Sequence, residues 1–372
     1  MKIALDGYEA NVEQRLGSSQ VAFELLKNLE EIDHKNEYSI LLPDKPLPDL
    51  PKERVGWKYK ILKPKRLWTI LALPFFLYTT KDKPDLIFSP THYIPHFSPV
   101  KRIVTIFDLS FLHFPQSFLK KDLWQLTRWT KFSVENANHI ITISNFSKID
   151  IIKKYKVSKN KITVAYPGYD KDKFKVQSSK FKVEEIKERY GIEGNYIIYI
   201  GTVQPRKNLI RLMEAVARID NLKLVIVGKT SGEGKQGWMY DETLAAPKSL
   251  KIKDRVKFLG FVPTEDLQYL LSGAVAFIQP SLWEGFGIPV VEAMACGVPV
   301  LVSNNSSLLE VAGKGGLGFD PYSIDQIEQA IRTIVSDHKL RQKLSKIVLN
   351  QAKKFSWREM ARTILKTFEQ GI

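Results

Sequence analysis

SLWEGFGIPVVEAMACGVPV (Ser281–Val300) combines the exit of one strand, a glycine-rich loop, a short helix and the start of another strand. The run AVAFIQP before it, which ends at Pro280, has the continuous apolar character of a strand covered on both faces of a sheet. Pro289 suits the first turn of the helix, and Gly297 suits its C-terminal end. The stretch therefore predicts a strand–loop–helix–strand unit of a parallel α/β fold.

Two carboxylates and two glycines surround the start of this helix. Gly285 and Gly287 allow the backbone to approach a ligand closely, and the amides that open a helix attract anions. Glu284 lies on the loop, where it could hold hydroxyls of a transferred group or stabilise positive charge at a sugar carbon. Glu292, predicted in the first helical turn, could accept hydrogen bonds from ribose hydroxyls. The alternative for Glu292 is a charge that favours the helix start.

A second loop with the sequence QPRKN (Gln204–Asn208) follows an apolar strand that ends at Gly201 and precedes a helix. Arg206 offers a planar fork of donors and Lys207 a point charge, a pair that matches a diphosphate held at a helix N-terminus. Basic residues disfavour the positive end of a helix unless an anion is present. We therefore predict a phosphate site here, with a solvated turn as the alternative.

Length and composition describe a globular protein of two domains. The 372 residues exceed the usual size of one hydrophobic core, and 44% of them are hydrophobic. The 56 basic residues against 40 acidic ones give a net charge of +16, which favours an anionic partner without naming it. The single cysteine, Cys296, excludes an intramolecular disulfide framework and favours a reducing compartment. The start, MKIALDGYEA, does not resemble a signal peptide, and no stretch of the sequence is long enough to span a bilayer, so we expect a cytoplasmic protein.

Strands and helices alternate along both halves of the chain. The predicted strands are 2–7, 38–42, 85–90, 102–108, 139–144 and 161–168, then 195–201, 222–228, 255–260 and 274–280. We predict an N-terminal domain over 1–169, a linker over the polar, lysine-rich 170–190, and a C-terminal domain over 191–355. Asp170 and Asp172 have metal-ligand spacing, but a solvated turn is expected and no metal is assigned.

Several weaker signals lie in the N-terminal half. Gly17 follows the first strand in a strand–glycine loop–helix start. His92 and Asp108 follow strands, and ligands gather at the carboxyl ends of parallel strands, although a loop histidine and a cap explain them equally. The apolar segment Leu67–Tyr78 follows a cluster of basic residues that starts at Lys58. Lys58–Tyr78 therefore favours either interior packing or contact with an anionic membrane surface.

The two loops resemble a known family. Glu284 through Glu292 resembles the Glu-x7-Glu motif of retaining GT-B glycosyltransferases, and PSLWEGFGIPVVEAMACGVPV is similar to the donor-site signature of glycosyltransferase family 4. IGTVQPRKNL resembles the donor-phosphate loop of that family, and GFVPTEDLQYLLSGA its next strand–helix unit. TISNFSKIDI, VAYPGYD and FSWREMA resemble the end of its acceptor domain and its closing helix. The resemblance covers nearly the whole chain.

The resemblance implies a GT-B fold, in which two Rossmann-like domains face a central cleft and the closing helix 356–372 packs back on the N-terminal domain. The N-terminal domain 1–169 would bind the acceptor and the C-terminal domain 191–355 the nucleotide sugar. Arg206 and Lys207 would neutralise the diphosphate without a metal, and Gly17 would approach it from the opposite domain. The predicted catalytic residues are Glu284, Arg206, Lys207 and Asp108. The predicted donor-binding residues are Gly17, Gly201, Arg206, Lys207, Val262, Glu284, Gly285, Phe286, Gly287, Ile288 and Glu292.

One position departs from the family pattern. Related enzymes commonly carry His-Asp after the strand 102–108, whereas this chain has Phe107 before Asp108. The role of that histidine therefore does not transfer to this position. His92 and His113 are the candidates that could compensate.

These observations lead to one hypothesis with alternatives. The chain is expected to be a metal-independent retaining glycosyltransferase that needs no cofactor and moves a hexose to a glycan or lipid-linked glycan. The donor would be a GDP- or UDP-sugar, with mannose from GDP-mannose favoured, and the enzyme would work in the cytoplasm or at the inner face of the membrane. Nucleic acid is not an expected partner. The alternatives are a GT-B epimerase, a catalytically silent sugar-binding relative and a basic surface-binding protein.

Overall fold

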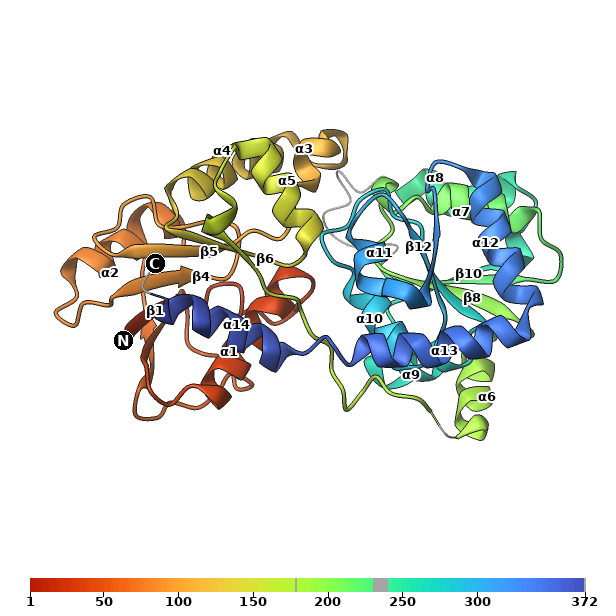
Figure 1. Cartoon of the computed structure of the whole chain (residues 1–372), viewed down its shortest axis with the longest axis horizontal. Helices are drawn as coiled ribbons and strands as arrows, with labels where there is room; N and C mark the ends of the chain where they lie inside the picture. The colour runs from red at the N-terminus through yellow and green to blue at the C-terminus, as the bar shows by residue number, and fades with distance from the viewer. Residues whose placement is uncertain (178, 230–239, 371–372) are drawn as a thin grey trace. The chain divides into compact units, whose positions relative to one another are not determined.

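The computed structural model describes residues 1–177, 179–229 and 240–370, which form two α/β units (Figure 1). Unit 1 contains Met1–Leu109, Lys121–Gly168 and the chain from Ser356 onward, and unit 2 contains Ser110–Lys120 and Tyr169–Phe355. The segment 110–120, placed with the N-terminal domain from sequence, thus groups with unit 2. The glycine-containing loop between Lys229 and Tyr240 lies outside the described residues.

The sheet of unit 1 has seven parallel strands in the order β3-β2-β1-β4-β5-β6-β7. They are β1 (Lys2–Asp6), β2 (Glu37–Leu42), β3 (Trp57–Ile61), β4 (Leu86–Ser89), β5 (Lys101–Thr105), β6 (His139–Thr142) and β7 (Ile162–Val164). Apolar runs such as Ile3–Leu5 are buried on both faces, as parallel strands require. The strand order reverses between β1 and β4.

Helices and short helical turns connect these strands. In chain order they are α1 (Ser18–Ile32), η1 (Trp68–Ala72), α2 (Leu73–Thr79), α3 (Ser110–His113), η2 (Pro115–Ser117), α4 (Lys120–Asn136), α5 (Asn145–Tyr155) and η3 (Lys159–Lys161). Helix α1 buries Val21, Leu25 and Leu29 along one face, at the spacing of a helix that covers a sheet. Helix α5 is capped at its start, since Ser144 Oγ accepts a hydrogen bond from Ser147 N.

The closing helix α14 (Trp357–Glu369) belongs to unit 1 and packs against α1. Its apolar face includes Met360 and Ile364, both buried. The ring of Phe368 lies 5.3 Å from that of Phe88 on β4, centroid to centroid. Hydrophobic spacing identified this face in the sequence but could not indicate which core it covers.

The sheet of unit 2 has six parallel strands in the order β10-β9-β8-β11-β12-β13. They are β8 (Tyr196–Ile200), β9 (Lys223–Val227), β10 (Val256–Gly260), β11 (Ala276–Gln279), β12 (Val300–Ser303) and β13 (Gly316–Phe319). Chain order runs from β8 through β9 to β10 in one direction and then returns to β11 on the other side of β8. The strand order therefore reverses between β8 and β11.

Helices cover both faces of this sheet (Figure 1). They are α6 (Lys180–Arg189), α7 (Leu209–Ala217), α8 (Tyr240–Ser249), α9 (Thr264–Ser272), α10 (Ile288–Ala295), α11 (Ser307–Ala312), α12 (Ile324–Ser336) and α13 (His338–Ala352), with short turns η4 (Pro205–Lys207), η5 (Lys253–Arg255) and η6 (Gly313–Gly315). α7 contacts α8 and α12 on one face, and α10 contacts α9, α11 and α13 on the other. Buried Leu212, Val216 and Ile331 join the core with the strands.

The structure adds a strand to those predicted from the sequence and shortens the predicted linker. The added strand is β3, an edge strand in which buried Trp57 alternates with exposed Lys58 and Lys60, so the lysines obscured its apolar pattern. The predicted linker 170–190 contains α6, which buries Ile186 and packs against α9. The linker prediction was too long because α6 is polar on most of its surface.

The segment Leu67–Tyr78 divides between the core and the surface. Trp68, Leu73 and Leu77 are buried among core residues of unit 1. Leu71, Phe75 and Tyr78 are 47%, 70% and 57% exposed. No helix in the described part of the chain combines the length and apolar character that crossing a bilayer requires.

Candidate active site

The two loops singled out in the sequence follow β8 and β11, the strands between which the strand order of unit 2 reverses. Ligands of open parallel sheets bind outside the carboxyl ends of the strands at such a reversal. The loops are joined directly, because Leu282 N donates a hydrogen bond of 2.8 Å to Arg206 O. The structure thus brings both predicted loops to the position where a ligand is expected.

The loop after β8 is held in place by its last residue. Pro205–Lys207 forms one turn of 3-10 helix, and Asn208 then adopts a left-handed conformation with φ of 61°. The Asn208 amide donates hydrogen bonds of 3.1 Å to Pro280 O and 2.7 Å to Pro321 O. Asparagine tolerates this conformation better than most side chains. One side chain therefore ties the Arg206–Lys207 turn to the loop after β11.

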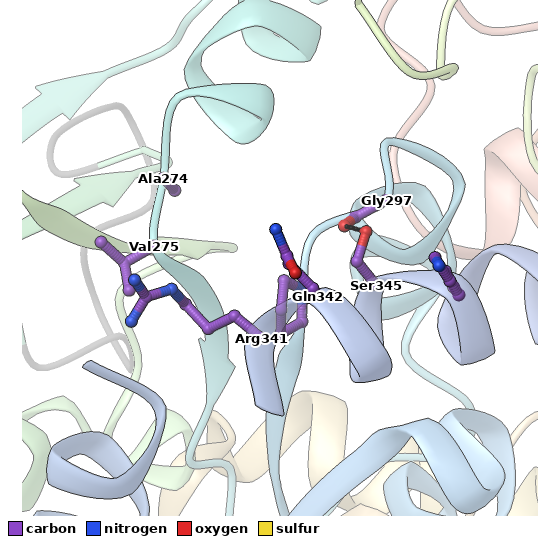
Figure 2. A pocket seen from close by; sticks show the side chains of 8 residues that line it. Ala274, Val275, Gly297, Arg341, Gln342 and Ser345 are labelled. Atoms are coloured by element: carbon purple, nitrogen blue, oxygen red, sulfur yellow. Dashed lines mark hydrogen bonds between the residues drawn. The ribbon is translucent and has the colours of Figure 1, made fainter. Parts of the chain in front are cut away.

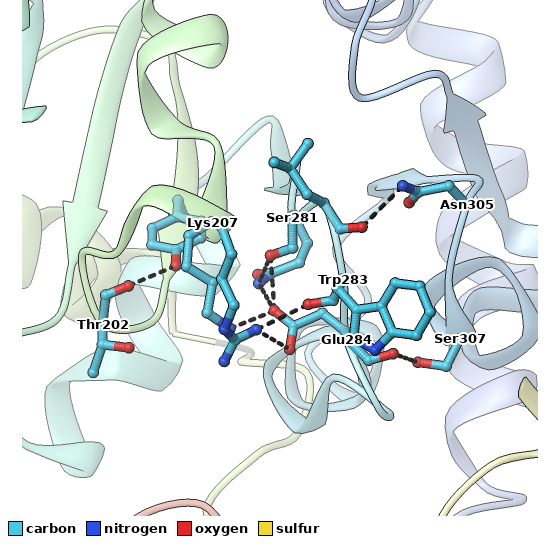
Figure 3. A network of polar contacts seen from close by, with 11 residues as sticks. Thr202, Lys207, Ser281, Trp283, Glu284, Asn305 and Ser307 are labelled. Carbon is cyan, nitrogen blue, oxygen red and sulfur yellow. Dashed lines mark hydrogen bonds and ion pairs between the residues drawn. The ribbon is translucent and has the colours of Figure 1, made fainter. Parts of the chain in front are cut away.

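A buried ionic cluster lies between the two loops (Figure 3). Glu284 is only 8% exposed, and its Oε1 accepts hydrogen bonds from Lys207 Nζ, from Ser281 Oγ at 2.7 Å and from Gln279 Nε2 at 3.0 Å. Arg206 Nη1 lies 3.5 Å from Glu284 Oε2. Two cations therefore share one carboxylate, and the cluster keeps a net positive charge.

The backbone around Glu284 is also fixed. Arg206 Nη1 donates to Trp283 O at 2.9 Å, and Ser307 Oγ donates to Glu284 O at 2.8 Å. Burial alone would raise the pKa of Glu284, but the charges of Lys207 and Arg206 and the hydrogen bonds of Lys207 and Ser281 lower it to about 2. Glu284 is therefore ionised at neutral pH and holds both cations in position.

Glu292 differs from Glu284 in its partners and in the direction of its pKa shift. It is the fifth residue of α10, so the prediction that it lies in the first turn is wrong, and a favourable charge at the helix start does not explain it. Its side chain is partly buried and has no hydrogen bond or ion pair within the described chain. Burial, with a further contribution from Asp170, raises its pKa to about 7. Such a carboxylate can accept hydrogen bonds from ligand hydroxyls.

The glycine-rich loop ends at Gly287, a position that only glycine can occupy without strain. Its φ is 96°, and a Cβ would lie 2.6 Å from Leu308 Cδ2. Gly287 precedes α10, whose first turn contains Pro289 as predicted. The Phe286 side chain is buried and its ring lies 5.3 Å from that of Phe355. Its contribution to a ligand site would therefore come from the backbone amide.

The other predicted donor residues of unit 2 lie in the segments that follow strands β8, β10 and β11. Gly201 follows β8, Val262 is buried just after β10, and Ile288 is the first residue of α10. A cavity of about 460 Å³ lies at the opposite edge of the sheet, at the amino ends of β11 and β12 (Figure 2). Arg341 and Ser345 line it, and both already donate hydrogen bonds to backbone carbonyls.

The remaining predicted residues divide between the units. Gly17, with φ of 59°, precedes α1, and Asp108 is partly buried after β5; both belong to unit 1, and their roles remain predictions. The His92 ring lies 5.6 Å from that of Phe107, and burial lowers the His92 pKa while Asp108 opposes the effect. The His113 ring stacks on Trp283 within unit 2, with centroids 3.8 Å apart.

Three contributors to the cluster were not predicted. Gln279 and Ser281 support Glu284, and Asn208 locks the neighbouring turn. The signal in the sequence was a glutamine inside an otherwise apolar strand, because a buried amide needs a polar partner. Among the described residues, no group of three or more His, Cys, Asp or Glu side chains is arranged to hold a metal. Asp170 Oδ1 instead accepts from the amides of its own turn, 3.0 Å from Asp172 N.

Comparison with known families decides the classification. The family described as Glycosyl transferases group 1 matches residues 182–351, and Glycosyltransferase Family 4 matches residues 17–173. O-antigen chain mannosyltransferase B of Escherichia coli is 31% identical over 320 residues, which cover 84% of this chain and 79% of that protein. The chain belongs to glycosyltransferase family 4. It is therefore a glycosyltransferase.

Solved structures show that this family 4 glycosyltransferase has the GT-B fold. Sucrose-phosphate synthase from Thermosynechococcus elongatus matches with a TM-score of 0.79 at 20% identity, over 99% of this chain and 98% of that one. HepE from Anabaena in complex with UDP-glucose matches with a TM-score of 0.76 at 19% identity, over the full length of both chains. At this identity the likeness concerns the fold alone, and it confirms the predicted pair of Rossmann-like domains.

The raised pKa of Glu292 predicts how stability depends on pH. Between pH 4.5 and about 7 the folded state binds more protons than the unfolded state at this residue, so its contribution to stability falls as pH rises through this window. Glu292→Gln should remove that dependence. Urea denaturation should show the stability of the variant rising relative to the parent by on the order of 2 to 3 kcal/mol between pH 4.5 and pH 8. Parallel pH profiles would contradict the assignment.

Proposed function

We propose that this enzyme transfers mannose from a nucleotide diphosphate sugar to a glycan or lipid-linked glycan with retention of configuration. The observation that carries the proposal is the buried cluster of Arg206, Lys207 and Glu284 at the strand-order reversal of unit 2. A pair of cations held rigidly beside a glycine-rich loop suits a diphosphate. The unpartnered carboxylate of Glu292 suits the two hydroxyls of a ribose.

The proposed chemistry uses the cations to stabilise the leaving group. As the bond from the sugar C1 to the diphosphate oxygen breaks, negative charge grows on the diphosphate, and Lys207 and Arg206 are already oriented toward an anion. They supply this charge in place of a metal. Within unit 2 the loop 285–287 completes the proposed donor site, with its amides near the donor sugar. Asp108 and Gly17 of unit 1 keep the roles predicted for them from the sequence.

We propose that retention proceeds without a covalent intermediate. Glu284 Oε1 accepts hydrogen bonds from Lys207, Ser281 and Gln279, Oε2 lies 3.5 Å from Arg206 Nη1, and a pKa of about 2 makes the carboxylate a weak nucleophile. We infer that the acceptor hydroxyl attacks C1 on the face from which the diphosphate departs. A new C1–oxygen bond forms, and the hydroxyl proton passes to the departing phosphate oxygen.

The donor is inferred from the relatives. The E. coli relative is named a mannosyltransferase, which favours mannose and, with it, GDP-mannose. HepE was solved with UDP-glucose, which keeps a UDP-sugar as the alternative. Parallel assays with GDP-mannose and UDP-glucose, both with a mannose-terminated oligosaccharide as acceptor, separate the two donors.

Neutralising Lys207 should abolish most of the transfer. We expect Lys207→Met to lower kcat by about 10²- to 10³-fold, the usual cost of losing one charge-stabilising group. Because this variant leaves Glu284 buried with one cation fewer, the double variant Lys207→Met/Glu284→Gln, which removes both charges, serves as the folding control. Arg218→Ala removes two ion pairs at the surface of unit 2, with Asp325 and Glu328, and should retain full activity. Recovery of transfer in the double variant would refute the role given to Lys207.

We also propose that unit 1 contacts the cytoplasmic face of an anionic membrane. Leu71, Phe75 and Tyr78 recur at helical spacing and are all exposed along η1 and α2. The exposed Lys60 and Arg66 lie close by in the sequence and have no ion pair within the described chain. Apolar side chains beside unpaired cations are the combination that anionic headgroups bind. A lipid-linked acceptor would be met at the same surface.

Vesicle binding tests this contact. The double variant Leu71→Ser/Phe75→Ser should bind vesicles of phosphatidylglycerol and phosphatidylcholine at least about tenfold less tightly, since each buried side chain contributes about 1.5 to 3 kcal/mol. Phe181→Ser removes an 81% exposed aromatic ring from unit 2 and should leave sedimentation with vesicles unchanged. Equal sedimentation of the parent and the double variant would rule the contact out.

A further inference from the structure

Unit 1 contains a cavity of about 790 Å³ that the donor site does not use. Asp6, the last residue of β1, and Thr91, which follows β4, both line it. It therefore lies at the carboxyl ends of the two strands between which the strand order of unit 1 reverses. The volume falls within the range of about 300 to 1,000 Å³ that ligand pockets occupy. We call this cavity the β1–β4 pocket.

A buried carboxylate lines the β1–β4 pocket. Asp6 is 5% exposed, and its Oδ1 accepts hydrogen bonds from Trp68 Nε1 at 2.9 Å and from Tyr8 N at 3.1 Å. Its Oδ2 has no hydrogen-bond donor among the described residues. Glu9 adds a second carboxylate to the lining, also without a donor in the described chain. Glu9 is only partly buried, and each carboxylate has an oxygen that no donor in the described part of the protein reaches, so the pocket is suited to a ligand that brings hydroxyl donors.

Aromatic rings form two other parts of the lining. The rings of Tyr8 and Trp68 lie 5.4 Å apart, and those of Tyr93 and Trp129 also lie 5.4 Å apart, nearly perpendicular at 79°. All four residues line the pocket. A hexopyranose has apolar C–H faces and a rim of hydroxyls, so it can pack on aromatic rings while it donates hydrogen bonds to Asp6.

Cations complete the lining. Arg66 and Lys121 are exposed and make no hydrogen bond or ion pair with described residues, whereas Lys65, also in the lining, is paired with Asp44. An arginine and a lysine without protein partners bind phosphate or carboxylate oxygens well. A neutral sugar would use the aromatic rings and Asp6 but would leave both cations without a partner.

We propose that the β1–β4 pocket binds the terminal hexopyranose of the acceptor, and that this acceptor carries an anionic group which Lys121 and Arg66 recognise. The inference rests on the proposed transfer reaction and deepens it by assigning the acceptor class. Hydroxyls of the sugar donate to Asp6 Oδ2, and its apolar face packs on Trp129. The anionic group is a phosphate or a carboxylate.

Calorimetric titration of the full chain, without nucleotide, tests the sugar site. The probes are methyl mannoside, mannose 6-phosphate and methyl glucuronoside. Trp129→Ala should lower the affinity for all three probes by about tenfold or more, because the sugar would no longer bury its apolar face against an aromatic ring. Trp124→Ala removes a 60% exposed ring from the same helix, outside the lining, and should change nothing. Asp6→Asn keeps the shape of the side chain and should also lower the affinity for all three probes. Trp129→Phe keeps an aromatic ring and should retain binding.

The same titrations test the anionic group. The phosphate probe, the carboxylate probe or both should bind about tenfold more tightly than methyl mannoside. This is the gain expected from one hydrogen bond to a charged group. The tighter of the two charged probes identifies the anionic group. Lys121→Ala should remove this advantage and leave methyl mannoside binding unchanged. Equal affinity of the three probes for the parent protein would overturn the anionic acceptor. Unchanged binding in both Trp129→Ala and Asp6→Asn would overturn the sugar site.

The outcome is separable from that of the proposed transfer reaction. Lys207→Met should bind all three probes as the parent does, because it alters only the donor cluster. A chain that binds the sugars in the β1–β4 pocket but turns over no nucleotide sugar would refute the transfer reaction. A chain that turns over nucleotide sugar while the pocket variants keep normal sugar binding and turnover would refute the assignment of the pocket.

Discussion

The buried ion pair between Lys207 and Glu284 is the interaction on which the site depends. Removing two charges from water is costly, and this cost is offset only when geometry and additional hydrogen bonds are good. Ser281 and Gln279 supply those bonds, and Arg206 adds a second cation at 3.5 Å. The result is a rigid group with surplus positive charge. A protein that needed only stability would gain as much from apolar packing at this position.

The sheet topology explains why these residues meet. Lys207 and Glu284 are 77 residues apart, yet their loops follow the adjacent strands β8 and β11. Unit 1 repeats the arrangement, since Asp6 and Thr91 follow the adjacent strands β1 and β4. In open parallel sheets, ligands bind outside the carboxyl ends of the strands at such a reversal. One constraint of parallel sheets thus accounts for the positions of both the Arg206–Lys207–Glu284 cluster and the β1–β4 pocket.

Much of this could be predicted from the sequence because the signals are local. Buried parallel strands are continuous apolar runs, and Pro289 and Gly297 delimit α10 by backbone chemistry. Strand β3 was missed because an edge strand alternates lysine with apolar residues, and α6 because few of its residues are buried. The donors to Glu284 and the lining of the β1–β4 pocket depend on tertiary neighbours, which spacing in the sequence does not reveal.

We propose that the Lys207–Glu284–Arg206 cluster recognises the diphosphate of the donor. Calorimetric titration with GDP and GMP measures this directly, because the two ligands differ by one phosphate. The parent protein should prefer GDP by about 10- to 100-fold, the value of one or two charged hydrogen bonds. Lys207→Met should lose most of that preference while its affinity for GMP changes little. An undiminished preference for GDP in the variant would contradict the account.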